Sequence, residues 1–162
     1  MLSLGDARAE HWITLPSSGA RVKLRSLSGA EYFAAQQAAV ARSREMALPP
    51  PDESASEEEK ARAAERETLP DGLDRENPAH ILGLGLSLFA QEFARLAVTD
   101  WKREDSAEDD SDGVYSGIAE ECTPENAALL AAQFAHDGEA IRTAIEARGR
   151  PAIQSEASEG NA

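Results

Sequence analysis

Cysteine is almost absent from this sequence, and Cys122 is its only example. A single cysteine forms no internal disulfide, which is typical of proteins that work in a reducing cytoplasm. Met1–Asp6 carries no basic cluster and no long apolar run, so we expect no signal peptide. The most apolar stretch, Ile81–Ala90, is too short for a transmembrane helix, which needs about 20 residues.

Basic residues are also scarce: 16 Lys and Arg stand against 30 Asp and Glu, and the formal net charge is −14. Nucleic-acid binding needs clustered basic side chains, and anionic membrane surfaces repel acidic proteins. We therefore expect neither nucleic acid nor membrane as a partner. The expected partners are proteins with basic or apolar surfaces.

Aromatic side chains contribute only 5% of the residues, although hydrophobic residues make up 41%. Much of the hydrophobic share is alanine, which favours helix but buries little area. We expect a thin core and modest stability of the free chain, which a bound partner would raise by mass action.

Signals of catalysis and of metal binding are missing from the sequence. His11, His80 and His136 have no ligand-like spacing, and Cys122 has no neighbouring cysteine or histidine with which to build a zinc site. No nucleotide-binding or hydrolase motif occurs. The sequence predicts a protein that is not an enzyme and needs no cofactor or metal.

One acidic stretch comes close to the calcium loop of an EF-hand. The first, third, fifth and sixth places match at Glu108, Asp110, Asp112 and Gly113. The twelfth place, which requires a bidentate glutamate, is Ala119. We therefore interpret this stretch as an acidic surface loop.

Local patterns predict a β-hairpin and then a helix at the N-terminal end. His11–Leu15 and Arg21–Leu27 carry strand formers on either side of a turn with proline and glycine. Ser28 and Glu31 have the spacing of a capping box, so a helix should start there and run to about Met46.

Phe33, Val40 and either Gln36 or Gln37 should line one side of that first helix. Pro49–Pro51 ends it, and residues 49–76 form an acidic segment rich in proline and glutamate. Glu57–Glu67 has helix-forming residues without an apolar stripe, so it is either an exposed helix or a disordered segment. The solvated, disordered alternative is favoured.

Asn77 and Pro78 are typical first residues of a core helix, which should continue to about Ala97. The apolar positions near one face of it are Leu82, Phe89, Phe93 and Leu96. Residues 98–101 should end this helix, and residues 102–113 should form an acidic loop.

Thr123 and Pro124 open another helix, and Asp137 can cap a last one, which Gly149–Pro151 should close. The predicted fold class is therefore mainly α with a short N-terminal β-hairpin, an α+β fold. Its segments are residues 1–48 (hairpin plus helix), 49–76 (linker or exposed helix), 77–150 (helical core domain with the acidic loop 102–113) and 151–162 (polar tail).

Three segments of the second half carry a resemblance to a known family. These segments are Leu96–Trp101, Asp112–Gly113 and Cys122–Leu130. Together they resemble the V-x-x-W, D-x-x-G and T-x-E-N-x-x-x-L-L motifs of tail assembly chaperones of tailed bacteriophages. Trp12–Ala39 is similar to the N-terminal segment of that family, and Glu159–Ala162 is similar to its short tail.

The chain departs from that family at two places. The family usually places Gly-Val after the tryptophan and an acidic residue, where this chain has Lys102–Glu104 and then a longer acidic insertion. Residues 49–77 look like a second insertion. Both departures concern loops and leave the expected core helices unchanged.

The resemblance implies a helical morphogenesis factor that acts in the cytoplasm of the bacterial host and is absent from the mature virion. Such proteins bind the long, hydrophobic tape measure protein, keep it soluble and help to recruit tail tube subunits. The sequence leaves open whether the source is a phage, a prophage or a gene transfer agent. It also leaves open whether a frameshifted long form exists and whether the chain forms a homo-oligomer.

The candidate contact surface is apolar and lies mostly on helices. Its residues are Leu82, Leu86, Phe89, Phe93 and Trp101, with Leu130 and Phe134 as further candidates. The same residues are equally suited to a plain core, which is the favoured alternative, and Trp101 would then cover the end of the core helix. Two other functions stay open: a virion structural protein (a head–tail connector or a minor tail subunit), or an acidic inhibitor that covers a basic partner.

Overall fold

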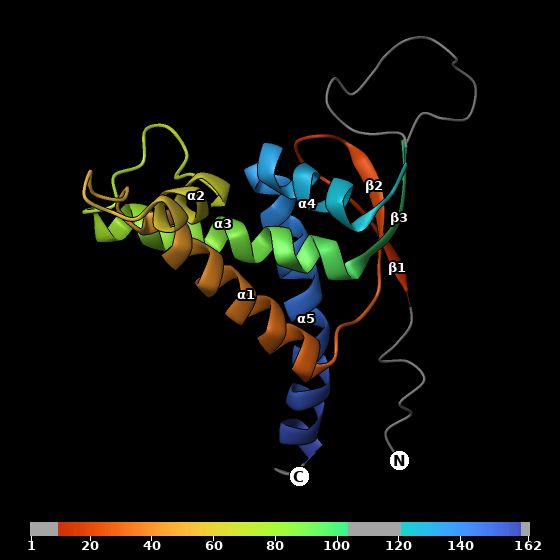
Figure 1. Ribbon diagram of the computed structural model, residues 1–162. Coiled ribbons are helices and arrows are strands. Elements are labelled where there is room, and N and C mark those ends of the chain that lie inside the picture. Colours follow the sequence, from red (N-terminus) through yellow and green to blue (C-terminus); the bar gives the residue numbers. More distant parts are fainter. Residues whose placement is uncertain (1–9, 104–120, 160–162) are drawn as a thin grey trace.

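The computed structural model describes residues 10–103 and 121–159 and has the α+β fold that the sequence predicts (Figure 1). Its elements are β1 (His11–Thr14), β2 (Ala20–Leu24), α1 (Gly29–Ala47), α2 (Glu57–Glu65), α3 (Pro78–Ala97), β3 (Val98–Arg103), α4 (Pro124–Gln133) and α5 (Ala135–Glu159). None of the helices in the described ranges combines the length and the apolar composition needed to cross a bilayer.

The predicted hairpin is part of a three-stranded antiparallel sheet with the order β1-β2-β3. The prediction that residues 98–101 only end the helix, and that Lys102 and Arg103 belong to a loop, is wrong: they form β3, which pairs with β2. Trp101 lies opposite Val22 in this pair. β-branched and aromatic residues suit a strand, but the strand forms only because β2 supplies its hydrogen-bonding partners.

Helix α1 begins at the predicted capping box. The Ser28 hydroxyl accepts a hydrogen bond from the Glu31 backbone N–H at 3.2 Å, and a Glu31 carboxylate oxygen accepts one from the Ser28 N–H at 2.8 Å. Phe33, which was expected to line one side of this helix, is 63% exposed and so does not belong to its buried face. The residues that α1 buries are instead Ala35, Ala39, Ser43 and Met46. Small side chains on this face let α1 lie close against its neighbour.

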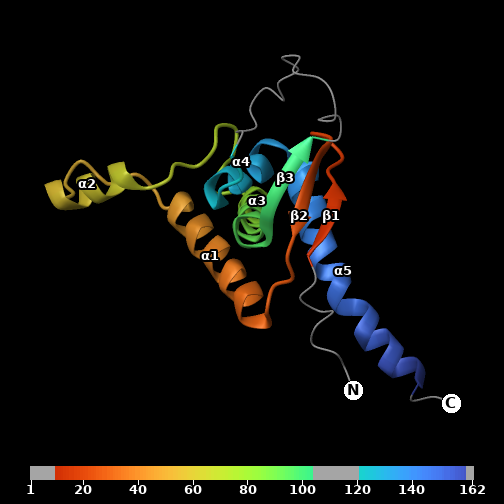
Figure 2. The same ribbon diagram turned by 90° about the vertical axis from the view of Figure 1, so that its right-hand side faces the viewer.

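Helix α3 runs through the centre of the molecule, with α1, α4, α5 and the sheet around it (Figures 1 and 2). One buried cluster joins the sheet to the end of α3, α4 and α5, and includes Val22, Ala94 and Ile141. A second cluster joins α1 to the middle of α3 and includes Ala39 and Phe93. Nine of the 20 buried hydrophobic residues in the described ranges are alanine. Because the alanine side chain is small, the helices approach one another closely but bury little apolar area at these positions.

Helix α5 packs its first turn against α3 and α4 at Gly138. A Cβ atom at this position would lie 3.1 Å from the Ala131 carbonyl oxygen and 3.2 Å from the Ala90 Cβ, so glycine allows this close approach without displacing its neighbours. The prediction that Gly149–Pro151 closes the last helix is wrong, since α5 continues to Glu159. Pro151 has no backbone N–H, so α5 continues with one helical hydrogen bond unmade at that position.

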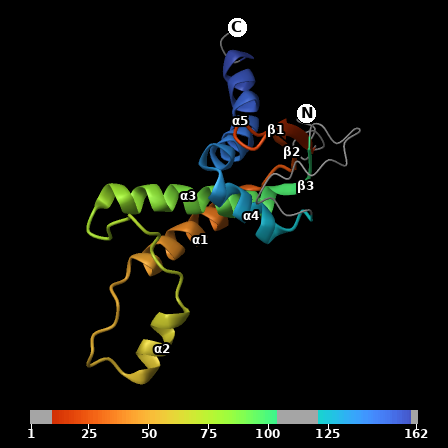
Figure 3. The same ribbon diagram turned by 90° about the horizontal axis from the view of Figure 1, so that it is seen from above.

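Residues 48–77, which we call the acidic arm, leave the end of α1 and return to the start of α3. The arm contains ten Asp and Glu against four Lys and Arg. Its α2 is an exposed helix that buries no residue, rather than the disordered segment that was favoured, and it extends away from the other helices (Figure 3). The Ser56 and Glu59 side chains form a second capping box at its start.

Candidate protein-binding groove

The predicted contact residues divide into two groups in the structure. Phe89, Phe93 and Leu130 are buried, while Trp101 and Phe134 are half-buried against the core. Leu82 and Leu86 are different, because they are 67% and 56% exposed. Only these two of the candidate residues are therefore mainly available to a partner.

The exposed and buried candidates on α3 belong to the same face of the helix. Leu82, Leu86 and Phe93 lie within about 40° of one another around an ideal helix axis. At Phe93 this face is covered by Tyr32 of α1, whose ring centroid lies 5.1 Å away, and by Ile145 of α5 in the same cluster. Nearer the start of α3 the face has no such cover, which leaves the two leucines exposed.

Leu82 and Leu86 border an open groove of about 610 Å³ between α1 and α3. The lining residues are Gln36, Ala39, Val40 and Ser43 from α1, Pro78, Ile81, Leu82, Gly85, Leu86 and Phe89 from α3, and Arg75 and Glu76 from the arm. Most of these side chains are apolar or small, and the charged ones lie at the end where the arm returns. The groove is a surface on which apolar side chains of another molecule can be buried.

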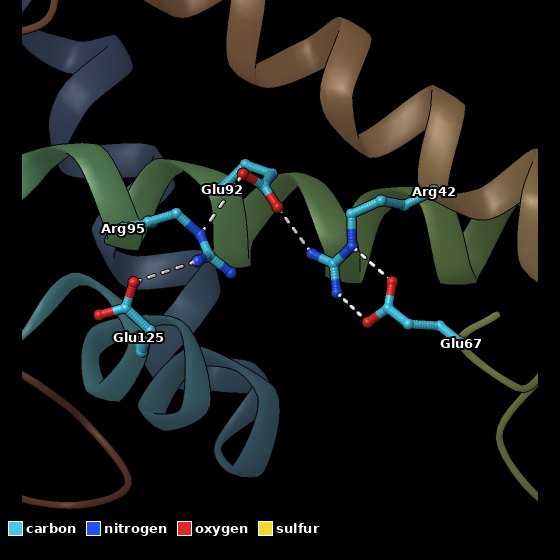
Figure 4. Close-up of polar contacts among 5 residues, drawn as sticks. All are labelled: Arg42, Glu67, Glu92, Arg95 and Glu125. Carbon is cyan, nitrogen blue, oxygen red and sulfur yellow. Dashed lines mark hydrogen bonds and ion pairs between the residues drawn. The ribbon is translucent and has the colours of Figure 1, made fainter. Parts of the chain in front are cut away.

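A polar network on α1 and α3 holds the two helices together beside the groove (Figure 4). The Arg42 guanidinium donates to Glu92 on α3 at 2.7 Å and, through Nε and Nη2, to both carboxylate oxygens of Glu67 at 2.8 and 2.6 Å. Arg95 extends the network, with its Nε 3.6 Å from Glu92 and its Nη1 3.8 Å from Glu125 on α4. Because Arg42 donates to it, the pKa of Glu67 lies below its ordinary value.

The acidic arm lines the groove at its returning end, through Arg75 and Glu76. Arg75, near the end of the arm, donates from Nη1 to the carbonyl oxygen of Leu48 at the start of the arm, at 3.1 Å. Leu69 and Leu73 also pack against the cluster between α1 and α3. The arm is therefore attached to the groove-forming pair of helices, and its excess of carboxylates lies at that end of the molecule.

Basic side chains gather on a different surface, the outer face of the sheet. The Arg21 guanidinium lies 5.8 Å and the Lys102 ammonium 4.7 Å from the centroid of the Trp12 ring. Lys23, next to them in the sheet, pairs with Glu10 at 2.6 Å. These cations lie on different elements from the acidic arm.

Cys122 and His80 have defined surroundings in the described ranges. Burial, together with the Asp100 carboxylate, raises the pKa of the Cys122 thiol to about 11, so the thiol is a poor nucleophile near neutral pH. The His80 imidazole accepts a hydrogen bond from the Asp74 backbone N–H at 2.9 Å. Among residues 10–103 and 121–159, no group of three His, Cys, Asp or Glu side chains is placed to hold a metal ion. The EF-hand-like stretch lies outside the described residues.

Sequence reasoning identified one wall of the groove and missed the other. Gln36, Ala39 and Val40 of α1 line it together with the leucines of α3. The sequence pattern placed Val40 and either Gln36 or Gln37 on one side of α1, but it did not indicate a binding role for them. No protein-family model, no curated protein and no solved structure matches this chain.

Proposed function

We propose that this protein is a tail assembly chaperone of a tailed bacteriophage, prophage or gene transfer agent, which binds the tape measure protein in the groove between α1 and α3. The observation that carries the proposal is the exposure of Leu82 and Leu86, at 67% and 56%, on a chain whose net charge is −14. An apolar groove captures apolar side chains of the partner, while the surplus of carboxylates keeps the complex soluble.

The residues that carry the family resemblance support the scaffold of the proposed chaperone rather than its contact surface. The Thr123 hydroxyl accepts a hydrogen bond from the Asn126 N–H at 3.1 Å, and the Asn126 side chain donates to the Glu121 carbonyl at 2.9 Å. These contacts start α4. Trp101 packs β3 against the buried cluster of the sheet. Similar motifs would thus preserve the fold while the groove is adapted to each partner.

The size of the surface suits reversible holding. Burial of the exposed parts of these two leucine side chains contributes roughly 2–4 kcal/mol before the costs of association are subtracted. Contacts of this size give weak binding at one groove, which a growing tail tube can displace. Recruitment of tail tube subunits would use another surface of the protein and belongs to the same proposal.

The test is co-expression with the long, helix-rich protein encoded immediately downstream. With the wild-type chain, that protein should stay in the soluble fraction and co-purify, whereas the Leu82→Ser/Leu86→Ser variant should lose both effects. Leu129→Ser is the matched control, because Leu129 is 56% exposed but lies on α4, outside the groove. If the downstream protein stays insoluble with the wild-type chain, the chaperone proposal is wrong. If the chain is instead a constituent of purified particles, the virion structural alternative replaces it.

A further inference from the structure

We infer that the groove receives an amphipathic α-helix with basic residues beside its apolar stripe. This inference rests on the proposed function, because it specifies which part of a partner the groove binds. It follows from three features of the described chain: the helices that form the walls of the groove, the length of the groove, and the charge of the arm beside the groove.

The walls of the groove favour a helix over an extended strand. Both walls are helices, whose internal backbone N–H and C=O groups are already paired, so they offer no ladder of hydrogen bonds to a strand. An extended segment would leave its own backbone groups unpaired against an apolar surface, which is costly. A helix satisfies its own backbone and presents only side chains.

The spacing of the wall residues also matches a helix. Leu82 and Leu86 are one turn apart on α3, and Gln36 and Val40 are one turn apart on α1. Ala39 has a small side chain and Gly85 has none, which leaves room between them for the apolar side chains of an incoming helix. Along α3 the lining extends from Pro78 to Phe89, about 16 Å at 1.5 Å per residue, which corresponds to about three turns of a bound helix.

The acidic arm determines which charges the bound helix should carry. The arm has ten acidic and four basic residues and contributes Arg75 and Glu76 to the lining of the groove. Basic residues beside the apolar stripe of the partner are attracted to this end of the molecule, and acidic residues are repelled. A second copy of this chain is a poor occupant, because it would bring a second acidic arm toward the first.

The experiment measures fluorescence anisotropy of labelled model peptides with the full-length chain. The first peptide has leucines at helical spacing i, i+4, i+7 and lysines elsewhere. The second has the same composition with the leucines scattered, and the third keeps the leucine stripe but replaces every lysine with glutamate. We expect the striped lysine peptide to bind at least about tenfold more tightly than either of the others. Its affinity should also fall as salt is added.

Variants connect that binding to the groove. Leu82→Ser/Leu86→Ser should weaken binding of the striped lysine peptide at least about tenfold, and Leu129→Ser should leave it unchanged. Equal binding of the scattered or the glutamate peptide would overturn the inference, and so would an unchanged affinity of the double serine variant. Sedimentation of the free chain adds a further check, because a dimer that the double variant disperses would make a second copy the occupant.

The outcome separates the inference from the proposed function. If the striped peptide does not bind while co-expression still depends on Leu82 and Leu86, the inference is wrong and the chaperone proposal stands. If the peptide binds in the groove but the downstream protein stays insoluble, the chaperone proposal is wrong and the groove remains a receptor for basic amphipathic helices.

Discussion

The Asp137 carboxylate accepts a hydrogen bond from the backbone N–H of Ser18 at 3.0 Å, although the two residues are 119 positions apart. Its other oxygen accepts one from the Ser17 N–H at 2.7 Å. Asp137 and Ser18 are both buried. The first turn of α5 is thereby joined to the turn between β1 and β2.

Asp137→Ala should lower the free energy of unfolding by about 3 kcal/mol, because it leaves two backbone N–H groups of the turn without their charged acceptor. Urea denaturation followed by circular dichroism measures the change. Asp52→Ala, at an exposed position in the acidic arm, is the control and should change the free energy by less than about 0.5 kcal/mol. Equal stability of the two variants would contradict the structural role of Asp137.

Arg42→Ala should release the acidic arm from α1 and α3. The Glu92 carboxylate is mostly buried, at 12% exposure, and without Arg42 it keeps only the longer 3.6 Å contact with Arg95, so the change should cost about 1–3 kcal/mol. The Glu67 side chain is 53% exposed, so its contact with Arg42 contributes less to the free energy of unfolding. Limited proteolysis should show faster cleavage between residues 48 and 77. Arg62→Ala, which removes an exposed pair within α2, is the control that should change neither property.

Stability should fall in acid partly through Glu31. The Arg25 guanidinium, followed by the Ser28 backbone N–H, lowers the pKa of Glu31 from 4.5 to about 2. Because the folded-state pKa is depressed, this contribution is complete above pH 4.5 and disappears as the pH falls toward about 2. Glu31→Gln should therefore be about 1 kcal/mol less stable than wild type at pH 7, and the difference should vanish near pH 2. A difference that does not change with pH would refute this assignment.

Two glycines in helices should respond in opposite directions to the same substitution. A Cβ atom at Gly83 would meet nothing within 4 Å, so Gly83→Ala should stabilise α3 by about 1 kcal/mol. A Cβ atom at Gly138 would lie 3.2 Å from the Ala90 Cβ, so Gly138→Ala should push α5 away from α3 and lower the melting temperature. Thermal denaturation of the two variants tests the packing of α5, and a rise in both melting temperatures would contradict it.

The starts of the helices could be predicted from the sequence because capping is local. Ser28, Asn77 and Thr123 each accept a hydrogen bond from a backbone N–H two or three residues further along, so a short window contains the whole signal. The third strand could not be predicted in this way. Trp101 becomes part of a sheet only because Val22, far away in sequence, lies opposite to it.

The sequence indicates which face of α3 carries the candidate site, but it does not indicate how much of that face is exposed. Periodicity placed Leu82 and Phe93 on the same side of α3, which is correct for an ideal helix. How far along that side α1 and α5 provide cover depends on their crossing geometry, which no local pattern contains. The buried face of α1 was missed for a related reason, because alanines pack closely without being conspicuous among so many others.

Leucine methyl resonances offer the most direct test of the claim that the groove holds a foreign chain. The chain with ¹³C-labelled leucine methyl groups would be titrated with soluble fragments of the downstream tape measure candidate. The account predicts that the methyl signals of Leu82 and Leu86 shift on binding, while those of Leu129, equally accessible on α4, stay in place. Binding that leaves the Leu82 and Leu86 signals unmoved, or no binding of any fragment, would contradict it.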